Sequence, residues 1–539
     1  MSASGSNRAV HLAAAAELER LLLENAQAGS PSAIERQHKK GKLTIPERLE
    51  LLFDPQSPRF EIGAFAAAGM YEEWGEITSA AVRTVIGRVS GRDCIVIAND
   101  SMVKSGTWFP LTIKKILRAQ EIGLENRLPL IYLVDSGGLF LPLQAESFPD
   151  KENGGRIFFN NARLSAAGVP QIAAVMGPCV AGGAYIPALC DELLMVRGAG
   201  GIFLGGPHLV KAAIGEVADI EQLGGASTHA RLSGMADYED VSDAASLERL
   251  RRRAAQWPEP PPSSYAHGPT AQPESPADAI LDLLPADPRA GYDMRAVLRC
   301  IIDAGSWEEY KTAYGQTLLT ATARLEGRTI GVVANQRLVT RSGQGEMQIG
   351  GVIYSDSSDK AARFILNCNQ KQIPLLFVQD VTGFMVGTRA EQGGIIKDGA
   401  KLVNAVSNSR VPKVTLIVGN SYGAGNYALC GRAFGPRFML AWPSARIAVM
   451  GGDQAADTIL SIEKSKLGDR PMRPDEEAAI LDRIRKTYEA ALSPYYAAAR
   501  LWVDAVIDPR HTRAALVHLF SIACRYDPRP EFKLGVFQV

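Results

Sequence analysis

One internal repeat limits the folds open to this chain more than any other feature. Four segments recur in the same order about 240 residues further along, with the spacing held to within about ten residues. Chance supplies one such pair but hardly four in order, so the sequence predicts two copies of one structural unit. The pairs are GRDCIVIAND (91–100) with GRTIGVVANQ (327–336), LPLIYLVDSGG (128–138) with IPLLFVQDVTG (373–383), VPQIAAVMG plus AGGAY (169–185) with VPKVTLIVG plus GAGNY (411–427), and IFLGGP (202–207) with AVMGGD (448–453).

Each copy alternates short apolar runs, which favour buried strands, with helical stretches such as residues 109–127. Strands joined by helical crossovers form a largely parallel sheet, so we predict an α/β fold in tandem duplicate. Glycines follow the predicted strand ends in both copies, and open α/β sheets build their sites at that edge.

The seam between the copies is rich in proline. Nine prolines lie between Pro258 and Pro288, a density that excludes a long helix or a central strand. We predict an extended linker there. The predicted boundaries are a tail and amphipathic helix over 1–30, an N-terminal domain over 31–257, the linker over 258–290, and a C-terminal domain over 291–539.

Composition excludes several classes of protein. Lys plus Arg and Asp plus Glu both number 58, so no net positive charge attracts nucleic acid or an anionic membrane. The seven cysteines are scattered without a CxxC pair, which argues against a zinc ribbon and a disulfide framework. No apolar run is long enough to span a membrane, and the N-terminus does not resemble a signal peptide. We expect a cytoplasmic protein with no metal in this chain.

The repeated glycine turn has a chemical interpretation. A strand that runs into small residues and then into a helix presents unpaired backbone N–H groups, and the helix dipole favours negative charge there. Such a turn forms an oxyanion hole for an enolate or a similar developing charge. The alternative is that glycine serves only tight turn geometry and close packing. Two matched copies favour function, in a reaction where two oxygens become negative.

Other motifs are absent or ambiguous. The sequence contains no HExxH, GxxxxGK[ST] or strand-linked GxGxxG motif. The seven histidines show no metal-ligand spacing, and His208 alone lies inside a glycine motif, where it is read as a loop residue. Asp135 and Asp380 stand at equivalent strand ends, either as catalytic acids or as residues for helix capping or local hydrogen bonding.

Several long motifs resemble the carboxyltransferase (β) subunit of the biotin-dependent acyl-CoA carboxylases. The resemblance runs from about residue 30 to the C-terminus. Its motifs are HKKGKLTIPERLELLFDP (38–55), IANDSMVKSGTWFPLTIKKILRAQE (97–121), YLVDSGG, AGGAY, FLGGPHLVKAAIGE, GIIKDGAKLVNAV (394–406), SYGAGNYALCGRAF and RFMLAWPSARIAVMGGDQAA (437–456).

This resemblance implies two crotonase-like domains, the N-terminal one holding acyl-CoA and the C-terminal one holding carboxybiotin. In the family the active site lies between the N-domain of one subunit and the C-domain of another, and six β subunits assemble with six α subunits. Carboxybiotin is thought to release CO2, after which biotin takes a proton from the acyl-CoA. A biotin oxygen and a thioester oxygen then both need stabilisation, which accounts for two turns.

The resemblance also assigns roles to individual residues. The amides of Gly182 and Gly183 are implied to serve the acyl-CoA enolate, and those of Ala424 and Gly425 to serve biotin. The implied substrate-binding residues are Ser136, Gly137, Gly138, Gly155, Ala181, Tyr185, Gly205 and Gly206. The implied biotin-binding residues are Gly383, Phe384, Gly423, Tyr427, Gly451 and Gly452.

A partner chain is implied by two absences. The sequence contains no Met-Lys-Met biotinylation motif and no evident glycine loop for ATP phosphates. We therefore expect a separate biotin carboxylase and biotin carrier α subunit, which brings biotin as a tethered arm.

The motifs KSGTWFP, DSGG and GAGNY resemble the 3-methylcrotonyl/geranyl branch of the family, and the zinc ribbon of bacterial acetyl-CoA carboxylase is missing. The methylcrotonyl enzymes resemble FPDxxHFGRxFxNQ, whereas this chain has Gly155 in place of that phenylalanine. A missing phenyl ring leaves room for a longer acyl tail. We expect geranyl-CoA or another long branched acyl-CoA, with 3-methylcrotonyl-CoA or a neutral loop substitution as alternatives. Ser105 and Pro178–Val180 also depart from the family pattern, which removes neither turn but leaves the shape of the acyl pocket open.

Three rival functions stay open from the sequence. The first is the carboxyltransferase subunit of a biotin-dependent decarboxylase beside a membrane pump. The second is a crotonase-type hydratase, which needs paired acids in one half and no second hole. The third is an inactive scaffold β subunit, which has no need of vacant donors. Fold analogy alone does not decide among them.

Overall fold

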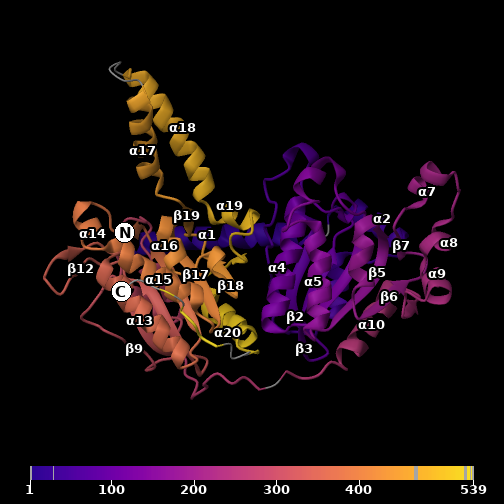
Figure 1. The fold of residues 1–539 in the computed structure, drawn as a ribbon, viewed down its shortest axis with the longest axis horizontal. Helices are drawn as coiled ribbons and strands as arrows, with labels where there is room; N and C mark the ends of the chain where they lie inside the picture. Colours follow the sequence, from indigo (N-terminus) through magenta and orange to yellow (C-terminus); the bar gives the residue numbers. More distant parts are fainter. Residues whose placement is uncertain are drawn as a thin grey trace. The chain divides into compact units, whose positions relative to one another are not determined.

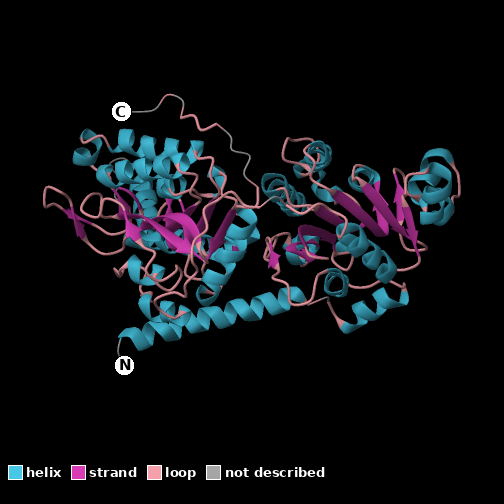
Figure 2. Cartoon of the chain, turned by 90° about the horizontal axis from the view of Figure 1, so that it is seen from below, coloured by secondary structure: helices cyan, strands magenta, loops and turns pink. Residues whose placement is uncertain are grey.

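The computed structural model describes residues 3–27, 29–260, 262–466, 472–526, 531–534 and 536. The chain divides into two compact units. The N-unit comprises Leu21–Pro261 with Ala498–Leu501, and the C-unit comprises Met1–Arg20, Pro262–Ala497 and Trp502–Val539. Each unit holds one large sheet with helices packed on it (Figures 1 and 2).

The N-unit sheet has the order β1-β2-β3-β4-β5-β6-β8, and β7 pairs with the end of β5. Strands β1, β2 and β3 pair antiparallel, and every later pair is parallel. The strands are β1 (Phe60–Glu61), β2 (Val82–Val89), β3 (Arg92–Asn99), β4 (Leu130–Ser136), β5 (Gln171–Val180), β6 (Glu192–Val196), β7 (Gly201–Phe203) and β8 (Tyr238–Asp240).

The C-unit sheet repeats this order as β9-β10-β11-β15-β17-β18-β20, with β19 pairing with the end of β17. Its first two pairs are also antiparallel and the rest parallel. The predicted duplication of one α/β unit is therefore confirmed. The strands are β9 (Glu308–Glu309), β10 (Leu318–Leu325), β11 (Arg328–Asn335), β15 (Leu375–Val381), β17 (Lys413–Tyr422), β18 (Phe438–Ala441), β19 (Arg446–Ala448) and β20 (Ala505–Val506).

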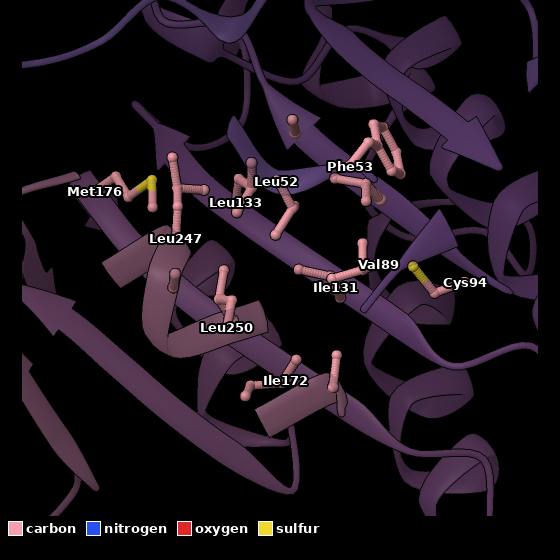
Figure 3. Close-up of a cluster of buried hydrophobic side chains, with 14 of the residues drawn as sticks. Leu52, Phe53, Val89, Cys94, Ile131, Leu133, Ile172, Met176, Leu247 and Leu250 are labelled. Carbon is pink, nitrogen blue, oxygen red and sulfur yellow. The ribbon is translucent and has the colours of Figure 1, made fainter. Parts of the chain in front are cut away.

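Alternate residues of the N-unit strands face two helical layers. Ile131 and Leu133 belong to one buried cluster with residues of α3 (Ile45–Leu52) and α10 (Asp243–Ala254), and Figure 3 shows them with Leu52 of α3 and Leu247 of α10. Tyr132, between them, faces α4 (Pro110–Asn126) and α5 (Gly154–Ala166). The C-unit helices equivalent to α4 and α5 are α13 (Ser355–Gln370) and α15 (Ile395–Asn408), which cover β11, β15 and β10.

Helix α4 shows how local sequence sets these elements. Pro110 lies in the first turn, where its missing N–H is not needed, and its fixed φ suits a helix. Arg127 ends the helix in the left-handed conformation. The helix predicted within 109–127 is therefore confirmed.

Two features differ from the sequence predictions. Residues predicted to include a polar tail form one helix, α1 (Ala3–Ala26), whose His11, Ala15 and Leu18 are buried. The segment predicted to be extended is helical over residues 277–283, where Ile280 and Leu281 are buried. Apolar residues between the prolines there find a core to pack against, which proline content alone does not reveal. The predicted domain boundaries stay a prediction.

The remaining elements connect these layers. Helices α17 and α18 pack against each other and rise from the C-unit in Figure 1. None of the described helices is long and apolar enough to cross a membrane. These elements are α2 (Pro31–Lys39), α6 (Tyr185–Ala188), α7 (Pro207–Ile214), α8 (Ile220–Gly224), α9 (Ala226–Thr228), α11 (Ile280–Leu283), α12 (Met294–Leu298), α14 (Thr388–Gln392), α16 (Gly423–Ala428), α17 (Gly452–Lys466), α18 (Pro474–Leu492), α19 (Pro494–Ala499), α20 (Thr512–Ala523), β12 (Thr340–Arg341), β13 (Met347–Gln348), β14 (Val352–Ile353) and β16 (Gly383–Phe384).

Candidate active site

The two repeated turns begin with the same backbone conformation. Strand β5 runs into a 3₁₀ turn, Ala181–Ala184, and then α6, whereas β17 runs directly into α16. The first residue of each turn is left-handed, with φ of +54° at Ala181 and +53° at Gly423. At Gly423 a Cβ would lie 2.9 Å from the Val449 carbonyl oxygen, so glycine is required there, whereas Ala181 accepts the strain of this conformation.

Backbone N–H groups are unpaired at both turns. Gly182 is the second residue of its 3₁₀ turn, and Ala424 and Gly425 are the second and third residues of α16, so these three N–H groups lack an intrahelical acceptor. Gly183 is the third residue of the 3₁₀ turn and reaches back to Val180 in the i→i−3 pattern. Among the described residues, none of these four amides donates a hydrogen bond outside its own turn. Gly182 and Ala424 are exposed, and Gly183 and Gly425 are buried. Each turn therefore offers neutral donors to an oxygen that becomes negative.

Three aromatic residues flank the turn in the N-unit. A Cβ on Gly182 would lie 3.7 Å from the ring of Phe158, and one on Gly183 would lie 3.6 Å from the ring of Trp108. The Phe158 ring is 5.8 Å from that of Tyr185 and 6.3 Å from that of Trp108, centroid to centroid. Apolar rings on this side suit a hydrocarbon chain next to the amide donors.

Predicted substrate residues from three strand ends meet at this turn. The Ser136 hydroxyl donates to the Gly106 carbonyl at 2.6 Å and accepts from the Gly138 amide at 3.1 Å. A Cβ on Gly138 would lie 3.2 Å from the Val180 carbonyl oxygen. Gly137 donates its amide to Ser105 at 2.9 Å, so the loop before α4 is tied to the same corner.

Gly206, which follows β7, also reaches this corner. A Cβ on Gly206 would lie 3.7 Å from the Val180 side chain, and Gly205 directly precedes it in the loop. The side chain of His208 lies outside the described part of the structure.

Gly155 occupies the second position of α5 and is exposed. A Cβ there would meet nothing within 4 Å. Phe158 is three residues further along and therefore on the same helix face, which it presents to Gly182. A larger side chain at position 155 thus has space to occupy beside the aromatic group.

The C-unit turn is surrounded more tightly. A Cβ on Gly425 would lie 2.5 Å from Val381, at the end of β15, and one on Gly451 would lie 3.6 Å from Tyr422. Tyr427 is half exposed and its ring lies 5.6 Å from that of Phe434. Phe384, next to Gly383 in β16, packs on α15 at Gly399.

A cavity of about 620 Å³ adjoins this turn within the C-unit. Gly451, Gly452 and Tyr422 line it, and its charged lining residues are Arg289, Arg337 and Arg446 together with Asp287 and Asp453. The amide donors of the neighbouring turn, next to a lining with three arginines and two aspartates, fit a small polar group that becomes negative, such as the ureido oxygen of biotin. The predicted biotin residues Gly383, Phe384, Gly423 and Tyr427 lie outside this lining, as do Ala424 and Gly425.

Asp135 and Asp380 are buried at matched irregularities of β4 and β15. A Cβ placed on Gly177 would lie 1.9 Å from the Asp135 carboxylate, and one placed on Gly419 would lie 2.5 Å from the Asp380 carboxylate. Each carboxylate therefore packs directly against a glycine of the next strand. Neither caps a helix. Their local hydrogen bonds fit the second alternative from the sequence, not a free catalytic acid.

Asp135 contacts Lys42 at 2.5 Å, Ser101 at 2.9 Å and Arg48 at 3.4 Å. Asp380 accepts from Tyr292 and the Asn420 amide, both at 2.9 Å, with Arg337 at 3.3 Å. Burial raises the pKa of Asp380 above its usual range, and Arg337 opposes that shift.

Sequence reasoning missed Trp108 and Phe158 as walls of the site. Two features of the sequence could have identified them: Trp108 lies within the motif KSGTWFP, and Phe158 is one helical turn after Gly155. Within the described residues, no three His, Cys, Asp or Glu side chains gather as a metal site would require.

Comparison with known proteins identifies the family to which these features belong. A family model described as a carboxyl transferase domain matches residues 36–530. The β1 subunit of the biotin-dependent 3-methylcrotonyl-coenzyme A carboxylase of Mycobacterium tuberculosis is 47% identical over 531 residues, which cover 98% of this chain and 97% of that protein.

Two further similarities span most of the chain. The mitochondrial methylcrotonoyl-CoA carboxylase β chain of Dictyostelium discoideum is 45% identical over 504 residues, 93% of this chain and 83% of that one. The solved structure of the geranyl-CoA carboxylase β subunit of P. aeruginosa superposes with a TM-score of 0.86 at 37% identity, covering 99% of this chain and 97% of that chain.

Proposed function

The chain belongs to the carboxyl transferase family, and on that premise we propose that it moves a carboxyl group from carboxybiotin to the γ carbon of a branched unsaturated acyl-CoA. The observation that carries this proposal is the matched pair of turns, each with unpaired amides and each at the same place in a duplicated sheet. A reaction that develops negative charge on two oxygens needs two such turns. A scaffold or a hydratase does not.

The residues of the N-unit turn act on the acyl-CoA. The amides of Gly182 and Gly183 donate to the thioester oxygen and stabilise it as an enolate, while Trp108, Phe158 and Tyr185 exclude water from the acyl chain. Loss of one such donor typically raises the barrier by about 2.7–4 kcal/mol.

The residues of the C-unit turn act on biotin. When bound, biotin would supply an activated carboxyl, and the amides of Ala424 and Gly425 would donate to its ureido oxygen. Gly423, Gly451, Gly452 and Tyr427 shape the turn and its adjoining cavity, and Arg337 and Arg446 favour negative charge there.

For the acyl group we propose geranyl-CoA or a similarly long branched chain. Support comes from the open space at Gly155 on the face of α5 that carries Phe158, and from the likeness to a geranyl-CoA carboxylase β subunit. The second candidate is 3-methylcrotonyl-CoA, which the names of the more identical relatives favour.

The biotin is proposed to arrive on an α subunit that also carboxylates it. The relatives named above are β subunits of carboxylases, which supports this partner. A β hexamer within an α6β6 assembly, a cytoplasmic location and a chain without metal stay proposals.

A carboxylation assay tests the function. The chain is combined with its α subunit, ATP and bicarbonate, and kcat/KM is compared for geranyl-CoA and 3-methylcrotonyl-CoA. We expect a preference for geranyl-CoA that Gly155→Phe reverses, because the ring fills the space of the longer tail. Gly155→Ala is the matched control, since its methyl group meets no atom within 4 Å.

Each other outcome has a definite meaning. Equal or better turnover of 3-methylcrotonyl-CoA by the wild-type protein makes Gly155 a neutral change and the second candidate correct. Carboxylation of neither thioester contradicts the proposed reaction and favours the scaffold.

A further inference from the structure

A network of buried polar side chains packs against α5, the helix that carries Gly155 and Phe158. Its members are Gln120 on α4, Tyr132 on β4, Asn161 on α5 and Gln171 on β5, and each is at most 1% exposed. None of them was identified by the sequence analysis. The proposed reaction has no use for them, so their presence in the core needs a reason.

The network forms hydrogen bonds with the backbone of α5. The Gln120 amide donates to the Ile157 carbonyl at 3.2 Å, and the Gln171 amide donates to the Asn161 carbonyl at 2.8 Å. These hydrogen bonds fix the position of the helix along its own axis. Contacts between apolar side chains are less directional and fix that position less closely.

Side-chain hydrogen bonds close the network. The Asn161 amide donates to Gln171 at 2.8 Å and to the Tyr132 hydroxyl at 3.1 Å, and its oxygen accepts from Gln120 at 3.3 Å. The Gln120 amide also reaches the Tyr132 hydroxyl at 3.2 Å. Since every member is bonded, the buried polar groups are satisfied where they stand.

Asn161 stands in the middle of an otherwise apolar helix face. The buried residues of α5 are Gly154, Ile157, Asn161 and Leu164, which share one face. A single buried asparagine in such a face specifies register and sacrifices stability, as in coiled coils. One residue of slippage moves a helix by about 1.5 Å along its axis.

The C-unit shows that the fold itself does not require the network. The positions equivalent to Gln120, Tyr132 and Asn161 are Ile365, Phe377 and Leu402, all buried and apolar. The position equivalent to Gln171 is Lys413, which is polar and buried and also ties its helix by the backbone. Its ammonium donates to the Val406 carbonyl at 2.9 Å, near the C-terminal end of α15. The network therefore belongs to the half that carries the acyl-CoA turn.

We propose that the Gln120–Tyr132–Asn161–Gln171 network fixes the axial register of α5 and thereby sets the acyl-chain preference, through the distance of Gly155 and Phe158 from the turn at Gly182. The four are positioning residues, because they act through α5 and touch no substrate. The second half of this inference rests on the proposed function.

The test replaces two members by the residues that the C-unit has at those positions, Tyr132→Phe with Asn161→Leu. The control is Asn369→Leu, which removes a buried asparagine that bonds Ser409 at 2.9 Å in the C-unit. Tyr132→Phe alone is a milder variant in case the double variant does not fold.

Three quantities are measured. They are the ratio of kcat/KM for geranyl-CoA over 3-methylcrotonyl-CoA in the complete complex, the ratio of calorimetric affinities of the full chain for the two thioesters, and hydrogen exchange over residues 154–166. We expect both ratios to move about tenfold toward one, a size typical of discrimination by a few methylenes, with faster exchange in α5. The control should leave both ratios within about twofold of the wild-type values.

Other results overturn the proposal. Proportional loss with both thioesters, or unchanged exchange in α5, makes the network merely structural. A wild-type ratio near one leaves no preference for the network to set. If the wild-type protein carboxylates neither thioester, the proposed function fails separately, and the affinity ratio with the exchange rates still decides this inference.

Discussion

The N-unit and the C-unit share one backbone plan but hold their matched carboxylates differently. Asp135 is neutralised by two cations, Lys42 and Arg48, whereas Asp380 has one, Arg337, and two neutral donors. One of those donors is the backbone N–H of Asn420, and the equivalent residue of the N-unit is Pro178, which has none. Where the backbone cannot supply a donor, side chains supply charge instead.

A second buried group is nearly the same in both units. Lys115 lies 3.7 Å from Glu61 and donates to the Ser79 carbonyl at 3.1 Å, and Lys360 donates to the equivalent Gly315 carbonyl at 3.5 Å. Both lysines stand at the sixth residue of their helix, and both are fully buried. Thus the buried lysine beside the first strands is kept in both halves, whereas the side chains that contact α5 and α15 differ.

The largest expected effect concerns the two carboxylates. Asp135→Asn removes a carboxylate from two buried cations, which leaves Lys42 without a counter-charge and Arg48 with Asp243 alone, at 2.8 Å. We therefore expect it to lower the free energy of unfolding by about 3–5 kcal/mol. Asp380→Asn should cost less, about 1–3 kcal/mol, because only one cation loses its partner. Urea denaturation of each variant measures both values. A larger loss of unfolding free energy for Asp380→Asn than for Asp135→Asn would show that the number of paired cations does not determine the cost.

The next largest effect concerns the turns. A Cβ on Gly425 would lie 2.5 Å from Val381, so Gly425→Ala must displace the turn and its donors, and kcat/KM should fall by about 10²–10³. Gly182→Ala makes ordinary contact with Phe158 at 3.7 Å, and we expect a fall of less than about tenfold. Steady-state assays of the complete complex measure both. The reverse order would mean that the exposed glycine is the more constrained one.

The lysines should show a pH effect of intermediate size. Burial lowers the pKa of Lys115 from 10.5 to about 7 and that of Lys360 to about 8, with Glu61 and Glu309 respectively opposing the shift. Above these values the folded chain has lost a proton that the unfolded chain keeps up to pH 10.5. The free energy of unfolding therefore rises with pH in that window, by at most about 1.4 kcal/mol per unit for each lysine.

Thermal unfolding between pH 6 and 9.5 checks this against Lys115→Met and Lys360→Met. The stability of the wild-type protein should rise relative to that of Lys115→Met above about pH 7, and relative to that of Lys360→Met above about pH 8. Parallel curves for all three proteins would mean that neither lysine changes its pKa on folding.

The smallest effect concerns the strained residue. Ala181 has the left-handed conformation that glycine provides at position 423, so Ala181→Gly should raise the free energy of unfolding by about 0.5–1 kcal/mol. Gly423→Ala should destabilise, since its Cβ would meet the Val449 carbonyl at 2.9 Å. Denaturation midpoints compare the two, and a loss of stability in Ala181→Gly would show that Ala181 makes a packing contact worth more than the strain.

Much of the fold could be predicted from single segments. Strands β3, β4, β5, β11, β15 and β17 lie within the segments read as strands, because a buried parallel strand is a continuous apolar run whatever its neighbours. The repeat then predicted a second sheet like the first. The proline segment was less predictable, since Ile280 and Leu281 become helical and buried only where a core is present.

The sequence by itself determined the duplication, the position of both glycine turns and the family, because these depend on the order of residues along the chain. Only the tertiary structure decided that Asp135 and Asp380 are buried ion-pair groups, that Trp108 and Phe158 flank Gly183 and Gly182, and that Asn161 is tied to two strands and a neighbouring helix. Those contacts join residues from elements far apart in the chain. Their energies depend on burial and on the partner across the sheet, and neither is written in any local pattern.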